Sequence, residues 1–268
     1  MKPLLGLDVV TVLSALAPAS KTSPVHGVRY AAFRMLITVR ERGGCGGGGV
    51  SYRDLELMLL DRGVEVDHTT IFRWIQDYVV ELEKRIRPHL RVSNGSWQMD
   101  ETYVKVEGRW IYLYRAVDNH APTIDFLLSA KRDAEAAKRF FRKALAQSHT
   151  VNPRTIRVDK NAAYPKAITE MKKDGELWRR STPRPVKYLN NIVEQDHRWV
   201  KRLTGPGLGF GSFWTARRTL AGYEAMVMIR KEQVRNVSGS DITTQAEFIA
   251  GLFHAAGRGR VAHGGRRR

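Results

Sequence analysis

Three acidic residues stand at positions from which they can act together in catalysis. Asp100 lies inside a predicted strand, Asp159 ends another predicted strand, and Glu194 lies in the first turns of a predicted helix. Three carboxylates in one pocket repel each other unless cations neutralise them, and Mg²⁺ prefers such oxygen ligands. Two ions about 3.5–4 Å apart can activate an attacking oxygen and stabilise a leaving oxygen. The residues therefore predict metal-dependent displacement at a phosphodiester.

Basic residues accompany the third carboxylate on its predicted helix. Arg198, Lys201 and Arg202 lie on or near the face that carries Glu194. A basic rim around an acidic pocket suits a nucleic-acid phosphodiester, so these three residues are predicted to contact DNA. The structural alternative is a solvent-exposed helix face on which Glu194 pairs with Arg198 one turn later.

Each carboxylate has a structural interpretation as well as a catalytic one. Asp100 could face solvent at a strand end, with its neighbour Glu101 as the rival ligand. Asp118 is a second rival but has the setting of a turn residue. Asp159 could cap the following helix, and Glu194 could complete a capping box. The joint pattern, and not any single residue, favours the catalytic interpretation.

The charge of the chain points to a polyanionic partner. Its 268 residues include 45 Lys and Arg against 27 Asp and Glu, a net charge of +18. Such an excess makes nucleic acid the first partner to consider and an anionic membrane surface the second. With 43% hydrophobic residues the composition is that of a globular protein. The single Cys45 excludes an internal disulfide framework and a Cys-based zinc finger, and it suits a reducing compartment.

The first 50 residues are expected to be a poorly ordered arm with a Gly-rich linker at 42–49. The apolar run near the N-terminus resembles a signal peptide, but Asp8 interrupts it and Pro18 lies beside the expected cleavage site. The run is too short to span a membrane, and no other candidate span is found. We therefore expect a cytoplasmic protein.

Residues 51–92 are predicted to form two helices joined by a turn. Ser51 starts the first helix with a capping-box pattern, and Asp67 can cap the second, which has a continuous apolar stripe. In a DNA-binding helix-turn-helix, the start of the second helix meets base edges in the major groove. The structural alternative is a plain helical hairpin. The residues predicted to contact DNA there are Thr69, Thr70 and Arg73.

From residue 96 to 235 the pattern changes to mixed strands and helices. An α/β order follows, in which the first and fourth strands could lie side by side. Residues 236–268 lose periodicity and are expected to form a basic, disordered tail. The predicted strands are Trp97–Val106, Arg109–Val117, Thr123–Leu128 and Thr155–Val158, and the predicted helices are Asp133–Ala146, Asn161–Lys173, Asn190–Leu203 and Phe213–Val234.

Three linked motifs carry a family resemblance that runs from about Ser51 to Val234. The first is Trp-Gln-Met-Asp-Glu-Thr-Tyr-Val-Lys at 97–105, followed by Gly-Arg-Trp-Ile-Tyr-Leu-Tyr-Arg-Ala-Val-Asp at 108–118. The second is Val-Asp-Lys-Asn-Ala-Ala-Tyr at 158–164, and the third is Tyr-Leu-Asn-Asn-Ile-Val-Glu-Gln-Asp-His-Arg at 188–198. In this order they resemble the motifs of bacterial DDE transposases of the insertion-sequence-six family.

The resemblance implies a fold, a site and a reaction. It implies a ribonuclease-H-like mixed sheet flanked by helices, preceded by a small helix-turn-helix domain that recognises terminal inverted repeats. Asp100, Asp159 and Glu194 would be the metal-binding triad, with two Mg²⁺ ions that Mn²⁺ could replace. The expected reaction is cleavage at the 3′ ends of the element, then attack of the freed 3′-OH on target DNA. A homodimer or larger synaptic assembly at the nucleoid is implied.

One departure from the family concerns the first helix of the DNA-binding domain and the activity of this copy. Family members usually enter the first helix of the DNA-binding domain through an apolar and aromatic helix, whereas this chain has the glycine run there. A frameshift near the start could produce this difference. One alternative is an inactive or regulatory relic that binds DNA without cutting it, although such a protein needs no converging carboxylates. The other is a metal-dependent nuclease without strand transfer, which would share the metal chemistry.

Overall fold

The computed structural model describes residues 51–61, 63–120, 122–159, 163–185, 201 and 209–254. The predicted arm 1–50, most of the predicted helix 190–203 and the end of the predicted tail lie outside these residues. The chain divides into two compact units, each described by itself below. Arg87–Arg235 forms one unit, and the other combines the chain up to Ile86 with the chain from Asn236 onward. The division therefore falls inside the segment 51–92 that was expected to be one domain.

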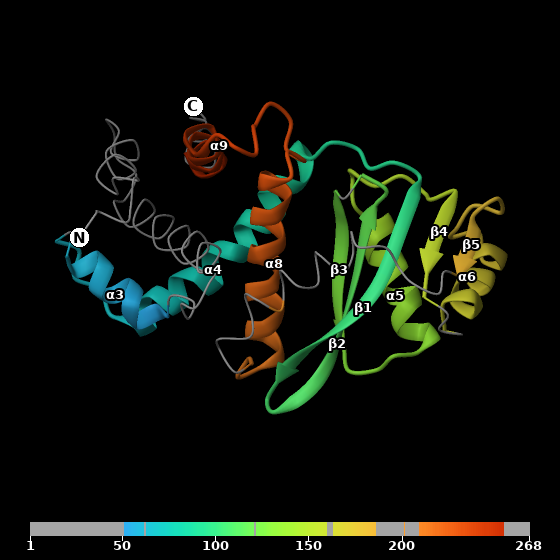
Figure 1. Ribbon diagram of the computed structural model, residues 1–268, viewed down its shortest axis with the longest axis horizontal. Coiled ribbons are helices and arrows are strands. Elements are labelled where there is room, and N and C mark those ends of the chain that lie inside the picture. Colours follow the sequence, from blue (N-terminus) through green and yellow to red (C-terminus); the bar gives the residue numbers. More distant parts are fainter. Residues whose placement is uncertain are drawn as a thin grey trace, which may run out of the picture. The chain divides into compact units, whose positions relative to one another are not determined.

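The unit that includes the chain up to Ile86, called the first unit below, contains the two predicted helices α3 (Tyr52–Leu60) and α4 (His68–Ile86) (Figure 1). The Ser51 side chain accepts from the Asp54 backbone N–H, and the Asp54 carboxylate accepts from the Ser51 N–H, so the predicted capping box is present. Gly63 lies between the helices with φ at +73°, a conformation that favours glycine. Buried Leu and Ile side chains of both helices form the core that local sequence periodicity predicted.

A third helix, α9 (Ile242–His254), lies in the segment where the sequence predicted no regular structure. It packs on α4 through Phe253, whose ring stacks on Tyr78 with centroids 4.5 Å apart. The Arg85 guanidinium lies 4.8 Å from the same ring and donates a hydrogen bond of 2.6 Å to the Leu252 carbonyl. Helical stability in proteins comes mostly from such packing and less from local propensity, so the helix was not evident from sequence.

The second unit, Arg87–Arg235, is built on a five-stranded mixed sheet with the order β3-β2-β1-β4-β5. The strands β1, β2 and β3 are antiparallel, and β4 and β5 continue the sheet in parallel from β1. The predicted contact between the first and fourth strands is therefore confirmed. The strands span Ser96–Val106, Arg109–Asp118, Thr123–Ser129, Thr155–Val158 and Thr182–Pro185 in chain order.

The strand β5 was not predicted, and its sequence explains why. It reads Thr-Pro-Arg-Pro, and proline lacks the N–H that a central strand needs. Such residues are tolerated at the edge of a sheet, which is where β5 lies. Its pairing with β4 is decided by the tertiary structure.

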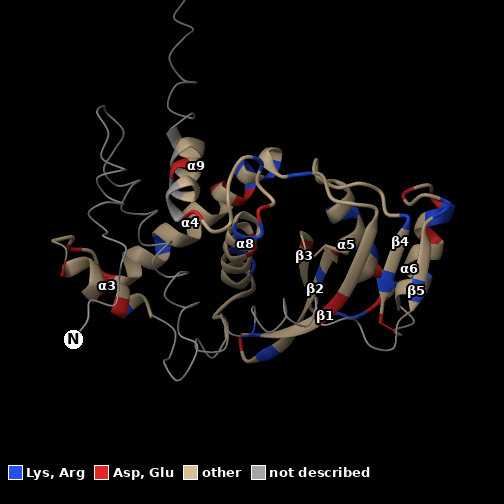
Figure 2. Cartoon of the chain, turned by 45° about the horizontal axis from the view of Figure 1, so that its top comes forward, with Lys and Arg blue, Asp and Glu red and all other residues tan. Residues whose placement is uncertain are grey.

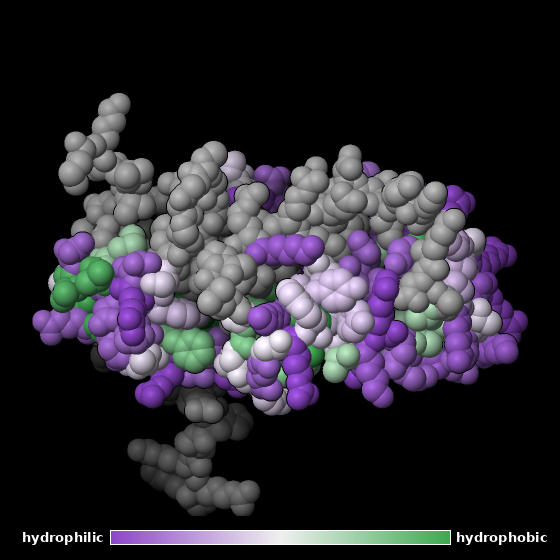
Figure 3. Space-filling view, turned by 60° about the horizontal axis from the view of Figure 1, so that its bottom comes forward, coloured by the Kyte–Doolittle hydropathy of each residue, from purple (hydrophilic) through white to green (hydrophobic). Residues whose placement is uncertain are grey.

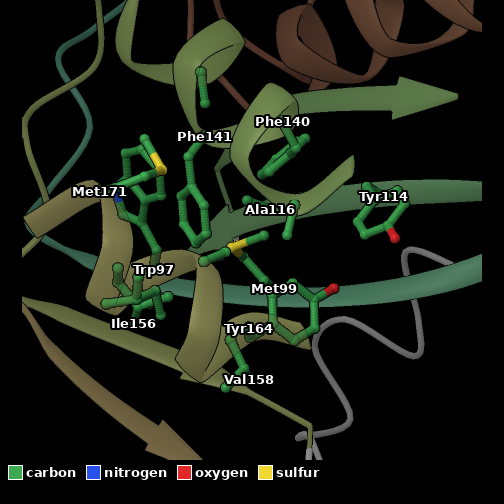
Figure 4. Packing of buried hydrophobic residues seen from close by; sticks show 14 of the residues in the cluster. Trp97, Met99, Tyr114, Ala116, Phe140, Phe141, Ile156, Val158, Tyr164 and Met171 are labelled. Atoms are coloured by element: carbon green, nitrogen blue, oxygen red, sulfur yellow. The ribbon is translucent and has the colours of Figure 1, made fainter. Parts of the chain in front are cut away.

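The core of this unit lies between the sheet and two helices, α5 (Ala134–Leu145) and α6 (Ala163–Lys173). Trp97 and Met99 of β1 meet Phe140 and Phe141 of α5, and all four are fully buried (Figure 4). Asp133 caps α5 by accepting from the Ala136 N–H. This layer holds β1 and β4 in a fixed position, which matters because both strands carry the acidic residues.

The helix α8 (Phe213–Arg230) covers the opposite face of the sheet (Figure 1). Successive strand residues point to opposite faces, and Tyr114 joins the α5 core while its neighbour Arg115 pairs with Glu224 of α8. A mixed sheet flanked by helices on both faces is the α/β, ribonuclease-H-like class that the resemblance implied, so this expectation is confirmed. No helix among the described residues is long and apolar enough to cross a membrane.

Candidate active site

The pairing of β1 with β4 brings the two predicted aspartates together. Gln98 of β1 is level with Arg157 of β4 in a parallel register. Continued by two residues, this register brings Asp100 of β1 next to Asp159, which directly follows the end of β4. A carboxylate oxygen from each of Asp100, Glu101 and Asp159 lies within 4.8 Å of the other two. Asp159 therefore joins the adjacent Asp100 and Glu101 through strand register and not through nearness in the sequence.

The two acidic neighbours on β1 approach the cluster from different faces. In the β1–β2 ladder Asp100 lies opposite Arg115. Glu101 lies opposite Tyr114, whose side chain is on the face covered by α5. The Glu101 side chain is only 3% exposed. Burial and the nearby Glu101 charge hold the pKa of the Tyr164 phenol well above its usual range, so this buried wall of the site stays neutral.

An arginine that the sequence analysis did not single out holds two of the carboxylates. The Arg132 Nε donates to Glu101 Oε1 at 3.1 Å, and its Nη2 donates to Asp159 Oδ2 at 2.9 Å. Arg132 lies between β3 and α5, where no spacing signal related it to either acid. Figure 2 shows the acidic segment of β1 among basic residues of the same unit. The guanidinium offsets part of the repulsion within the cluster.

Burial and the neighbouring negative charges change the pKa of Asp100. Burial first, and then the charges of Glu101 and Asp159, raise the pKa of Asp100 to about 6. The Glu101 N–H donates to Asp100 Oδ1 at 2.8 Å, and this hydrogen bond and the Arg132 charge act in the opposite direction. Carboxylates whose ionised forms are disfavoured in this way gain when a cation joins them.

This pKa shift predicts how stability depends on pH in metal-free buffer. The pKa of Asp100 is about 6 in the folded chain, whereas the unfolded side chain loses its proton near the ordinary aspartate pKa of 3.8. Since the folded state then binds more protons, the parent chain should lose stability relative to Asp100→Asn as pH rises from about 4 to about 6. Thermal melting of both chains in EDTA across this range measures the difference. Parallel melting curves would contradict the prediction.

Some of the other predicted site residues lie within the described part of the chain and some lie outside it. Asp118, the second rival ligand in the sequence analysis, is buried. Its carboxylate accepts a hydrogen bond from the His120 N–H at 2.8 Å, as is usual for a turn residue. Lys201 is exposed. The residues that lie outside the described part of the chain are Glu194, Arg198 and Arg202.

The predicted DNA-contacting residues of α4 differ in how far their polar groups are engaged. The Thr69 and Thr70 hydroxyls both donate to the Asp67 carboxylate at 2.5 Å, so they take part in capping the helix. Arg73, one turn further, is exposed. The charged end of Arg73 is therefore the better placed of the three to reach a partner.

The chemistry of the cluster is that of a hard-cation site. Asp100, Glu101 and Asp159 offer only oxygen donors, which divalent cations such as Mg²⁺ prefer over the nitrogen and sulfur ligands of zinc. The convergent oxygens and the partial burial therefore fit a divalent cation.

Comparison with known proteins agrees with this geometry. A family model described as a DDE domain matches residues 94–233, which include Asp100 and Asp159. The transposase of the insertion sequence-like element IS431mec from Staphylococcus aureus is 34% identical over 189 residues, covering 70% of this chain and 81% of that protein. The transposase of IS257 in transposon Tn4003, also from S. aureus, matches to the same extent.

Among solved structures, the HTLV-2 integrase catalytic core domain in complex with magnesium matches this chain. It covers 55% of this chain and 92% of its own, with a TM-score of 0.39 and 17% identity. The family model covers more than half of the chain, and the S. aureus relatives are matched over most of their own length at 34% identity. The chain therefore belongs to the DDE transposases of the insertion-sequence-six family.

Proposed function

We propose that this transposase binds the terminal inverted repeats of an insertion sequence, cleaves their 3′ ends and joins them to target DNA. The observation that carries the proposal is the convergence of Asp100 and Asp159 at the end of two parallel strands. Glu194, on the motif that resembles the family's third acidic motif, is proposed to complete the triad. Glu101, which is buried and ion-paired, is proposed to anchor Arg132.

The proposed cofactor is Mg²⁺, in two copies, with Mn²⁺ able to replace it. When bound, such ions polarise the phosphoryl oxygens and stabilise the attacking and leaving oxygens. Asp100 and Asp159 would hold them with Glu194. Arg132 would help to keep Asp159 near Asp100, because its guanidinium forms ion pairs with both Asp159 and Glu101, the neighbour of Asp100.

The reaction consists of two displacements at phosphorus. In the first, a water oxygen attacks the phosphodiester at the end of the element and a 3′ oxygen leaves. In the second, that 3′-OH attacks a phosphodiester of the target, joins to its phosphorus, and a 3′ oxygen of the target strand leaves. Neither step needs a covalent link to the protein, and the proposal assigns no nucleophilic side chain. Because two ends must meet, a homodimer or larger assembly acting in the cytoplasm, at the nucleoid, belongs to the proposal.

The test is incubation of the full chain with Mg²⁺ and DNA that carries the element's own ends. Nicking at the 3′ ends followed by joined products is expected. Cleavage without joined products would favour the nuclease, and binding without cleavage would favour the relic. Either result would overturn strand transfer by this copy. EDTA is the control, since it removes the cation without altering the chain.

A second experiment tests the recognition helix. Arg73→Ala should weaken binding to the terminal repeat by about 1–3 kcal/mol, and binding to random DNA by less, because Arg73 is exposed near the start of α4. Arg53→Ala is the matched control, since Arg53 is exposed on α3. Titration of both DNAs by fluorescence anisotropy measures the losses. Equal losses on both DNAs would mark Arg73 as a phosphate contact.

A further inference from the structure

The positive charge of the chain is unevenly divided between its two units. The unit made of Met1–Ile86 and Asn236–Arg268 has 16 basic and 12 acidic residues, and its segment Ser51–Ile86, which holds α3 and α4, has five basic and eight acidic residues. Arg87–Arg235 has 29 basic and 15 acidic residues. Phosphate contacts dominate the affinity of proteins for nucleic acid and come chiefly from Lys and Arg. The unit that holds the acidic cluster is therefore expected to supply a surface for DNA of its own.

One face of the β1–β2 hairpin has the side chains for such a surface. Tyr103 and Lys105 of β1 pair with Tyr112 and Trp110 of β2, respectively, and we name these four residues the hairpin strip. Trp110 is 66% exposed and Tyr103 is 46% exposed. Lys105 is also exposed. Large aromatic rings are thus open to solvent beside a cation.

The hairpin strip continues directly from the acidic cluster. Strand side chains alternate, so Tyr103 and Lys105 share the face of Glu101, and each step of two residues advances about 7 Å. The Tyr103 phenol is close enough to Arg132 to contribute to the raised pKa of that guanidinium. A strand of DNA held at the cluster would therefore meet Tyr103 first and the Lys105–Trp110 pair next.

The hairpin strip is held in place by the core of the unit and by a backbone contact at the edge of β1. Tyr112 packs against the core that α5 and α6 form, and the Tyr103 and Tyr112 rings lie 5.2 Å apart. Phe210 pairs with Val106 along the edge of β1, where the Glu107 N–H donates to the Phe210 carbonyl at 2.8 Å. Because Phe210 covers the edge there, the side-chain face is the part of this hairpin end offered to a partner.

The composition of the hairpin strip suits nucleic acid better than a second protein chain. Bases stack on Tyr and Trp rings whatever their sequence, and a neighbouring Lys can bind the phosphate between them. The end of the hairpin comes forward in Figure 3, where the described surface is mostly hydrophilic with small, separate hydrophobic areas. An extended apolar patch, which a stable protein interface would need, is not seen on the described part of this face.

We propose that the hairpin strip binds unpaired nucleotides next to the phosphodiester held at the acidic cluster. Tyr103 and Trp110 stack on successive bases, and Lys105 binds the phosphate between them. The role rests on the proposed function, because the DNA end must be opened for its terminal bases to be unpaired. It gives the catalytic unit a subsite for single strands that is separate from recognition by α4.

The test measures binding of the full chain to a short fluorescein-labelled oligothymidylate and to a duplex of the same length, in EDTA. Trp110→Ala should weaken binding to the single strand by about fivefold or more and binding to the duplex by less. Lys105→Gln should lower the salt slope for the single strand by about 0.7, the value for one phosphate contact. Trp110→Phe should retain most of the affinity, because it keeps an aromatic face.

The matched control is Trp178→Ala. Trp178 is 45% exposed but lies beside Gly95 and Ser96, at the opposite end of β1. It should leave binding of both DNAs unchanged. Equal loss of single strand and duplex for Trp110→Ala, or no loss, would overturn the proposal. So would a change in assembly mass by light scattering with unchanged DNA affinity, since that would mark the hairpin strip as a contact between copies.

The two proposals fail separately in this design. Binding in EDTA involves no bond cleavage, so it reports on the hairpin strip and not on strand transfer. If the parent binds the single strand through Trp110 yet joins no DNA in Mg²⁺, the hairpin strip is supported and the proposed strand transfer is not. If it joins DNA but Trp110→Ala binds normally, only the hairpin strip is overturned.

Discussion

Asp159→Asn is expected to lower Mg²⁺-dependent cleavage and strand transfer by about a hundredfold or more while binding to the DNA ends stays close to that of the parent chain. Asparagine keeps the size of the side chain but removes the charge that holds a cation beside Asp100. Loss of fixed electrostatic stabilisation of this kind costs about two to three orders of magnitude in rate. Gel assays of nicked and joined products, with anisotropy in EDTA for binding, measure both effects.

The same result is expected for Asp100→Asn and Glu194→Gln if the three residues form the triad. Glu107→Gln is the matched control, because Glu107 is an exposed carboxylate at the hairpin turn. It should keep strand transfer at the parental rate. Glu101→Gln should weaken activity less than the triad variants do, since its proposed part is to hold Arg132. Near-parental strand transfer by any triad variant would remove that residue from the site.

Glu224→Ala is expected to lower the free energy of unfolding by about 3–5 kcal/mol. Glu224 of α8 accepts from Arg115 of β2, with Glu224 Oε1 2.8 Å from Arg115 Nε and Glu224 Oε2 2.9 Å from Nη2. The side chains are 3% and 1% exposed, respectively. Removal of the carboxylate takes the Glu224 counter-charge away from a buried guanidinium. Urea denaturation followed by circular dichroism measures the loss.

Two comparisons separate burial of charge from loss of a contact. The double variant Arg115→Met with Glu224→Leu should recover most of the stability, because apolar residues of similar size can replace a buried ion pair. Glu176→Ala removes the partner of Arg142, which is 48% exposed, and should cost no more than about 1 kcal/mol. A loss at Glu224 as small as that at Glu176 would show that the buried pair is not desolvated.

Local signals in the sequence predicted most elements of the fold. The Ser51 capping box, the hairpin with its turn at Glu107 and Gly108, and the apolar side of α5 all appear where the sequence placed them. These features depend on neighbours a few residues apart. The strand β5 and the helix α9 were missed because each is stabilised by a distant partner, β4 and α4 respectively.

The sequence by itself determined the candidate acids and the family, because both are carried by residue types in short motifs. It also indicated that the strands of Asp100 and Asp159 could be neighbours. Only the tertiary structure decided that Glu101 and Arg132 join the cluster and that the pKa of Asp100 rises to about 6. The physical reason is that charge interactions and burial depend on distances of a few ångströms between distant segments. Strand register sets those distances, and no spacing in the sequence encodes them directly.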